Sequence, residues 1–340
     1  MIRNIIKNNT LTFTFLIISI LSFFLSELSI KIFLNDIIEK FGRNLFLVLS
    51  LIIPILTGMG INFALTIGAI SGQLSIIFII AMNIKGIIGV FTAFLISLPI
   101  SILFGIFIGI IMNKTKGKEM IISLIISYFF SGIYQIIILL IPISNPLISI
   151  DGNIKNTIDL SIIKYSLDKF PISIKLLGIK IPLFTLLLCL LLCLLIFYIN
   201  KTKLGQQMKY IAFNIKIAEE KGIDVNKIRV IAITLSTTFA GFGQIISLQN
   251  IGNMSTFGSH EQISLYSSAA ILMGGASIKK AHPINAIIGT LIFYTIFTIS
   301  PRIATNIFSS PQIGEFFRVF VAYSTIVLSL YINNKKSNNN

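Results

Sequence analysis

Long apolar runs, separated by short polar stretches, recur along the whole chain. A helix needs about 20 apolar residues to cross the hydrocarbon core of a bilayer, and somewhat fewer when it is short or broken. The approximate runs are 10–26, 45–67, 70–84, 86–112, 120–142, 182–199, 230–248, 265–278, 283–300 and 316–332. The pattern predicts an all-α polytopic membrane protein with about ten transmembrane helices. The count falls to nine or eight if the short third and eighth runs do not cross.

Basic residues in the connections between the runs indicate the orientation, because cytoplasmic loops carry an excess of lysine and arginine. Most of the 27 basic residues fall in alternate connections, which are 1–9, 113–119, 200–229, 279–282 and the C-terminal tail. We therefore expect these segments, and both termini, on the cytoplasmic side. The loop 143–181 is then external although it carries five lysines. It also carries three aspartates, and long loops follow the rule less closely.

Composition supports a single membrane domain. The chain is 55% hydrophobic and 11% charged, with a mean hydropathy of +0.92, whereas a soluble domain carries about 25% charged residues. The net charge of +15 is dispersed among the connections, which favours membrane orientation over nucleic-acid binding. We expect residues 1–332 to form one transmembrane domain in contact with lipid, and residues 333–340 to form a disordered cytoplasmic tail.

The interiors of the predicted spans contain no Asp, Glu, Lys or Arg, since Lys85 lies between two spans and Glu315 and Arg318 lie at the start of the last one. Carriers driven by a proton or sodium gradient usually bury an ionisable residue at mid-membrane. The chain also lacks the P-loop pattern that binds ATP, because Gly117-Lys118 is followed by Glu119. We therefore expect a conduit whose energy comes from another subunit. An ion-gradient-driven secondary carrier is the alternative, and a membrane scaffold without a transport role is a third class.

Uncharged polar residues stand among glycines in the segment 57–78. The glycines are Gly58, Gly60, Gly68 and Gly72, and the polar residues are Asn62, Thr66, Ser71 and Gln73. Such residues occur at membrane depth where helices pack closely, or where a broken helix lines a path for a polar solute. Both interpretations stay open from the pattern alone. Under the second, these four polar residues and Gln244 face the translocation pathway.

The loop 200–229 contains a predicted short helix. Asn214 is a suitable N-cap, strong helix formers follow from Ile215 to Lys221, and Gly222 is a suitable C-terminal stop. Ile217 and Ala218 could form a small apolar knob flanked by Glu219 and Glu220. The pattern favours either a docking element for a soluble partner or an ordinary basic loop against lipid headgroups.

The segment 269–290 holds a glycine pair, Gly274-Gly275, before Pro283 opens the next helix. His282 stands at this boundary, and His260 stands beside Glu261 in the preceding external loop. No third ligand lies nearby in sequence, so we interpret both histidines as surface residues and expect no metal site.

Together these segments resemble the permease of an ABC importer, of the type that serves simple sugars such as ribose, nucleosides and branched-chain amino acids. The resemblance covers about residues 45–330. The residues of the loop that match the family pattern T-x-x-G-R-x-x-x-A-x-G-x-N-x-x-A-A-x-x-x-G-I are Thr202, Gly205, Asn214, Ala218, Gly222 and Ile223. The residues that match A-A-x-x-L-G-G-x-S are Ala269, Ala270, Gly274, Gly275 and Ser277. TIGAISGQ at 66–73 is similar to the N-I-G-x-E-G-Q of nucleoside-type members, and INFA at 61–64 is similar to branched-chain amino acid permeases.

The resemblance implies partners and a mechanism. A second permease chain, identical or related, would complete the pathway, and two cytoplasmic ATPase subunits that bind ATP-Mg would dock beneath it. An extracytoplasmic binding protein would deliver the solute, for which we prefer a nucleoside or simple sugar to a branched-chain amino acid. The coupling residues would be Asn214, Ala218, Glu219, Glu220, Gly222 and Ile223. This chain would itself bind no cofactor and would not be an enzyme. Its abundance of Ile, Lys and Asn points to a bacterial inner membrane.

Overall fold

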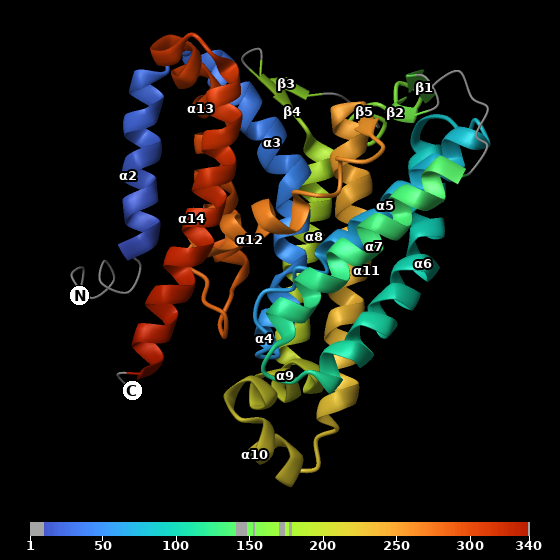
Figure 1. Cartoon of the computed structure of the whole chain (residues 1–340), viewed down its shortest axis with the longest axis vertical. Coiled ribbons are helices and arrows are strands. Elements are labelled where there is room, and N and C mark those ends of the chain that lie inside the picture. Colours follow the sequence, from blue (N-terminus) through green and yellow to red (C-terminus); the bar gives the residue numbers. More distant parts are fainter. Residues whose placement is uncertain (1–9, 141–147, 152–153, 170–173, 177–178, 339–340) are drawn as a thin grey trace.

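The computed structural model describes residues 10–140, 148–151, 154–169, 174–176 and 179–338 (Figure 1). The predicted cytoplasmic segment 1–9, the start of the external loop at 143–147 and the last two residues of the tail lie outside these ranges. The described part is mostly helical, as the sequence predicts.

The helices follow the predicted runs in most places. Their bounds are α2 (Thr10–Leu25), α3 (Ile30–Ser50), α4 (Ile52–Leu56), α5 (Leu65–Ala81), α6 (Gly86–Lys114), α7 (Glu119–Leu140), α8 (Leu183–Lys201), α9 (Lys203–Phe213), α10 (Ile215–Glu220), α11 (Val225–Ile251), α12 (Ile263–Met273), α13 (Pro283–Phe308) and α14 (Pro311–Asn338). Within the described residues, α6, α7, α8, α11 and α13 are long and apolar enough to cross a membrane. Shorter apolar helices are α2, α5 and α12. The chain is therefore a multi-pass membrane protein, and the count of ten spans stays a prediction.

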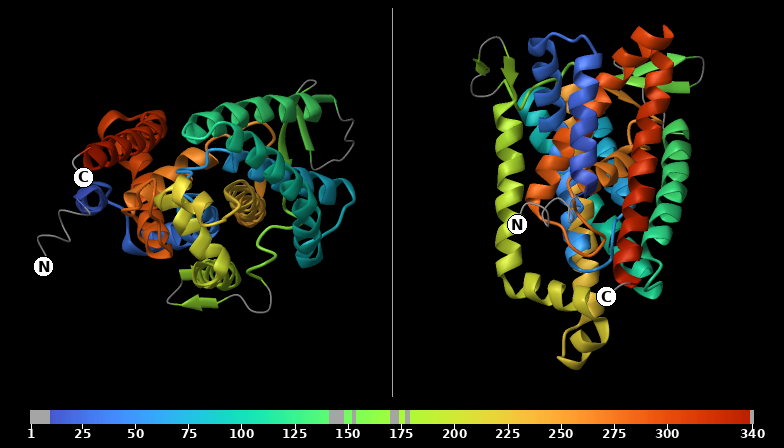
Figure 2. Two further views of the ribbon diagram at one scale, coloured as in Figure 1. Left: turned by 90° about the horizontal axis from the view of Figure 1, so that it is seen from below. Right: turned by 90° about the vertical axis from the view of Figure 1, so that its left-hand side faces the viewer.

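The long helices form a bundle with two different ends (Figure 1). At one end, which we call the α10 end, α9 turns across the bundle and α10 projects from it (Figure 2). The opposite end, which we call the strand end, carries the strands. A three-stranded antiparallel sheet has the order β1 (Ile148–Asp151), β2 (Ile154–Asp159), β5 (Asn253–Ser255), and β3 (Ile174–Leu176) pairs with β4 (Ile179–Ile181). The predicted external loop thus folds at the end opposite α10.

Close packing of α5 against α11 forms the centre of the bundle. A Cβ added at Gly68 would lie 2.4 Å from the carbonyl oxygen of Thr237, and one added at Gly72 would lie 2.5 Å from that of Gly241. Only residues without a side chain let two helix backbones approach this closely. The glycines of α5 therefore serve helix packing, which is one of the two interpretations left open by the sequence.

The second predicted span, 45–67, is wrong at both ends. Helix α3 begins at Ile30, and residues 57–64 are not helical. Consequently α3 contains five ionisable residues that were placed outside every span, namely Lys31, Asp36, Glu39, Lys40 and Arg43. Distant partners make this arrangement stable. The Tyr165 hydroxyl donates to Glu39 Oε1 (3.1 Å), and Lys40 Nζ donates to Thr298 Oγ1 (3.0 Å).

The last helix also differs from the prediction. Helix α14 continues to Asn338, so residues 333–338 of the predicted tail are helical. Once a helix has formed, each further residue adds one backbone hydrogen bond, and polar residues can therefore extend its end.

Candidate functional site

A cavity of about 370 Å³ lies between α5, α7, α12 and α14. Its polar lining residues are Thr66, Ser127, Tyr128, Ser131, Glu261, Gln262, Ser264 and Tyr323, and its apolar ones are Phe63, Leu124, Leu265 and Ile326. Pockets of this size hold small-molecule ligands. Thr66 is the predicted pathway residue that lines it.

Hydroxyl groups fix the geometry of the cavity wall. Thr66 Oγ1 donates to Ser264 Oγ (3.0 Å), which joins α5 to α12. On α7, Ser127 Oγ donates to the carbonyl oxygen of Phe63 (2.7 Å), and Ser123 Oγ accepts from the Phe63 amide (3.2 Å). The non-helical segment 57–64 is thus held by serines, which replace the hydrogen bonds that a continuous helix would have made.

Among the described residues, no lysine, arginine or histidine lines the cavity. Its one carboxylate belongs to Glu261, whose Oε1 accepts from Gln135 Nε2 (3.4 Å). Since a bound carboxylate needs a cation or several hydrogen-bond donors, this lining suits an uncharged solute with hydroxyl groups better than an anion.

A second polar cluster consists of Gln73, Tyr134 and His260. It adjoins the cavity, since His260 directly precedes Glu261 of the cavity wall. His260 Nδ1 and Gln73 Oε1 are 3.1 Å apart, and the His260 ring meets the Tyr134 ring edge-on with centroids 5.0 Å apart. The interpretation of His260 as a surface residue is therefore wrong, because its side chain is fully buried. Its loop folds back onto the bundle, where Gln244 Nε2 donates to the carbonyl oxygen of Ser259 (3.2 Å).

Each side chain of this cluster has a polar atom without a hydrogen-bond partner among the described residues. The atoms are Gln73 Nε2, the Tyr134 hydroxyl and His260 Nε2. An unsatisfied buried polar group costs about 1–3 kcal/mol, so these three atoms make the cluster a candidate for binding a polar molecule. None of the three atoms carries a fixed charge, which matches the lining of the cavity.

The predicted pathway residues Asn62, Ser71 and Gln244 are not among the residues that line the cavity. Asn62 is buried in the non-helical segment, where its Oδ1 accepts from the Ala64 amide (3.0 Å) and its Nδ2 has no partner among the described residues. Ser71 faces α6, since its Oγ bonds to Gly68 O (2.6 Å) and Ser97 Oγ (3.2 Å). Ser71 therefore contributes to helix packing.

The predicted short helix in loop 200–229 is confirmed as α10. Asn214 Oδ1 accepts from the amides of Lys216 (2.9 Å) and Ile217 (3.4 Å), which caps its start. At its end, the Gly222 amide donates to Glu219 O (2.9 Å) and the Ile223 amide donates to Ala218 O (3.1 Å). This pair of bonds is a Schellman motif, and Gly222 adopts the left-handed conformation that the motif requires (φ +73).

The exposed surface of α9 and α10 differs from the predicted apolar knob. Ala218 is fully buried, so it does not belong to the surface. Ile217 is 36% exposed, and Phe213, the last residue of α9, is 82% exposed. Sequence reasoning missed Phe213, although an aromatic residue directly before a helix cap in a polar loop is a signal for it. Glu219 forms an exposed ion pair with Lys116 (3.4 Å), which connects α10 to the turn between α6 and α7.

A buried ion pair joins α11 to α7. Arg229 of α11 donates to Glu119, the first residue of α7, and both side chains are largely buried. The pair joins α11, which follows α10 in the chain, to α7, which lines the cavity. His282, in contrast, is exposed at the start of α13, as predicted.

Comparison with known proteins gives one family. The family model described as "Branched-chain amino acid transport system / permease component" matches residues 33–330. No curated protein and no solved structure matched the chain.

Proposed function

The chain belongs to this family of ABC transporter permeases, and from this premise we propose that it forms the translocation pathway of an ATP-driven importer for small uncharged polar solutes. The family is a transport component and not an enzyme, and it works with ATPase and substrate-binding partners. In our proposal, this chain pairs with a second permease chain, two ATPase subunits that bind ATP-Mg dock at the α10 end, and a binding protein docks at the strand end. The membrane is a bacterial inner membrane.

The observation that carries the proposal is the projecting α9–α10 pair. Its short helix is capped at both ends, and Phe213 is exposed beyond the bundle. Exposed aromatic side chains of this kind are typical anchors of a protein interface, where they fill a pocket of the partner. The cap bonds support α10 as a rigid element that transmits movement of an ATPase to α11.

Purification of the tagged full-length chain from its host in mild detergent tests this docking. We expect a P-loop ATPase to co-purify at near one per permease chain. Phe213→Ser should lower its recovery at least about tenfold, because the loss of an interface anchor costs 2 kcal/mol or more. The matched control is Phe197→Ser, since Phe197 is also exposed but lies on the apolar helix α8. Equal ATPase recovery with both variants would refute the docking role of α9–α10.

The cavity lining supports the choice of solute. Six of its residues carry hydroxyl groups, three are aromatic and none is a cation. Hydroxyl and amide groups recognise the hydroxyls of a sugar, and aromatic faces pack on a sugar ring or nucleobase. A branched-chain amino acid would place its carboxylate where no cation balances it. We therefore prefer a nucleoside or a simple sugar.

Competition for uptake into proteoliposomes that contain the complete transporter tests the solute class. We expect a nucleoside or sugar to compete and leucine not to compete. Thr66→Val should raise KM for the solute, because it removes a hydroxyl from the cavity wall. Ser71→Ala, on the packing face of the same helix, should leave KM unchanged. Inhibition by leucine alone would overturn this assignment while leaving the ATPase docking intact.

One observation favours the alternative of a gradient-driven carrier, namely the Glu261 carboxylate in the cavity wall. A carrier of this class would use it as its ionisable residue. Glu261→Gln separates the two mechanisms. Uptake that still requires ATP and survives the substitution supports the importer. Uptake that continues without ATP and is abolished by the substitution supports the carrier.

A further inference from the structure

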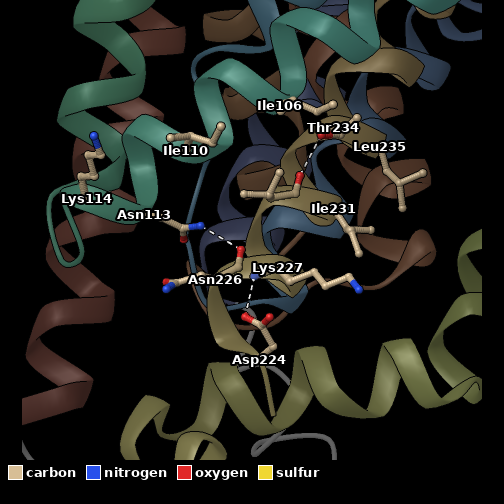
Figure 3. Close-up of a pocket in the computed structure, with 11 residues that line it drawn as sticks. Ile106, Ile110, Asn113, Lys114, Asp224, Asn226, Lys227, Ile231, Thr234 and Leu235 are labelled. Carbon is tan, nitrogen blue, oxygen red and sulfur yellow. Dashed lines mark hydrogen bonds between the residues drawn. The ribbon is translucent and has the colours of Figure 1, made fainter.

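An open apolar groove of about 830 Å³ runs between α6 and α11 at the α10 end of the bundle (Figure 3). It is separate from the solute cavity, since the two share no residue. The apolar walls are formed by Ile106 and Ile110 of α6 and by Val230, Ile231 and Leu235 of α11. Ile106 and Ile110 are 40% and 47% exposed.

Two glycines explain the shape of the groove. A Cβ added at Gly105 would lie 2.6 Å from the Thr234 Cα, and one added at Gly109 would lie 2.9 Å from the Val230 Cα. The helix backbones therefore touch along this line. The larger side chains that follow each glycine, Ile106 and Ile110, stand beside the line of contact and leave a trough along it.

The polar end of the groove lies at the level of lipid headgroups. Helix α6 has 29 residues, which at 1.5 Å per residue is about 43 Å, the thickness of a bilayer with its headgroup regions. Lys114 is its last residue. At the same level, Asn113 Nδ2 donates to the carbonyl oxygen of Asn226 (2.8 Å), and Lys227 lies on the other side of this contact (Figure 3).

The charge at this end is positive and free to bind an anion. Neither Lys114 nor Lys227 forms an ion pair with any described residue. The one acid of the lining, Asp224, accepts from the backbone amide of Lys227 (3.0 Å) as the cap of α11. Lys118 follows in the adjacent turn and adds to the positive field, whereas Lys116 is paired with Glu219.

We propose that this groove binds one anionic phospholipid, with its phosphate at Lys114 and Lys227 and an acyl chain along the apolar trough. The apolar walls match an acyl chain, and the basic rim matches a phosphate group. Lysines near a membrane surface attract anionic lipid, whereas a zwitterionic headgroup gains much less from them. The inference is independent of the transported solute and of the ATPase.

Native mass spectrometry of the full-length chain, titrated with phosphatidylglycerol or phosphatidylcholine of the same acyl chains, tests the site. We expect phosphatidylglycerol to bind more tightly. The double variant Lys114→Gln/Lys227→Gln should weaken its binding roughly 30-fold, the effect of two surface lysines. The matched control is Lys279→Gln/Lys280→Gln, because these two exposed lysines lie outside the groove lining. The control should bind as the wild type does.

A second variant tests the acyl chain, since Ile231→Trp should fill the trough and weaken long-chain lipids without affecting a short-chain phosphatidylglycerol. Equal binding of both lipids, or equal loss in the lysine variant and its control, would overturn the proposal. The competing occupant is a second copy of the chain. Copy-to-copy disulfide formation at Ile231→Cys, in a background without Cys189 and Cys193, would assign the groove to that interface instead.

Discussion

Replacement of Gly222 tests whether α10 acts as a rigid coupling element. Gly222 has φ +73, and a Cβ added there would meet nothing within 4 Å. A larger side chain therefore causes no clash, and its whole effect is the backbone strain of a left-handed conformation. This strain is about 1–2 kcal/mol for an ordinary L-residue, and it is larger for a β-branched one.

The strain acts directly on the two hydrogen bonds that end α10, because both require the left-handed residue. A cost of about 1–2 kcal/mol lowers the ratio of capped to uncapped α10 roughly 5- to 30-fold. Asparagine tolerates the left-handed region, alanine tolerates it less and valine least. We therefore expect the number of solute molecules transported per ATP to fall least in Gly222→Asn, more in Gly222→Ala and most in Gly222→Val.

The assay is the number of solute molecules transported per ATP hydrolysed, in proteoliposomes that contain the permease, its ATPase and its binding protein. The matched control is Gly117→Val. Gly117 lies in the turn between α6 and α7 at the same end of the bundle, has φ +88 and also has open space around it. Normal coupling in Gly222→Val, or an equal loss in Gly117→Val, would show that the end of α10 has no special role.

Three further predictions concern other sites. Glu119→Ala should destabilise the protein by about 3–5 kcal/mol because it leaves Arg229 buried without its partner, while Glu119→Leu/Arg229→Met should be near neutral; unfolding in detergent measures both. Gln73→Ala should change KM for the solute, and unchanged kinetics in a protein that assembles would contradict its role in the pathway. Asp168 lies in the predicted external loop before α8, where its carboxylate accepts from the amide and hydroxyl of Thr185 (3.0 and 2.8 Å). Burial raises the pKa of Asp168, so the stability that its protonated form contributes is complete below the unfolded pKa of about 3.9 and is lost as the pH rises through the folded value. Asp168→Asn should therefore raise the melting temperature at pH 7 and change it little at pH 4; a variant less stable than the wild type at pH 7 only would refute this.

The sequence predicted α10 in full because its signals are local. An asparagine cap, a short run of helix formers and a glycine stop act on backbone groups within a few residues of each other, so no distant contact decides the outcome. The identity of the exposed residues was less accessible. Whether Ala218 or Phe213 faces outward depends on how α9 and α10 pack on the bundle, which the loop sequence does not contain.

Helix α3 and His260 were misjudged for the opposite reason. The charges of α3 lower the hydropathy of its first half, and they are tolerated through Tyr165 and Thr298, which lie far away in the sequence. His260 is buried through Gln73, 187 residues distant. A pattern of polar and apolar positions cannot reveal partners at such separations, so it assigned these residues to the surface.

The polar residues of α5 show what helix geometry adds to such a pattern. At about 100° per residue, Thr66 and Gln73 lie on nearly the same face two turns apart, whereas Ser71 lies about 140° from Thr66. The structure agrees, since Thr66 lines the cavity, Gln73 meets His260, and Ser71 bonds to α6. The sequence could have separated Ser71 from the other two. It could not have shown which of the two faces meets the cavity.

The distribution of charge favours an external source of energy for transport. Four of the five ionisable residues of α3 fall in the half of the helix toward the strand end, and the Glu119–Arg229 pair lies at the α10 end. Between them, Thr66 and the Gln73 cluster offer only groups without a fixed charge. Among the described residues that line the cavity, Glu261 is the one with an ionisable carboxylate, the kind of group through which a carrier is coupled to an ion gradient. The projecting, doubly capped α10 is then the element best placed to deliver the energy, because it is continuous through a short turn with α11, which packs on α5 along its glycines.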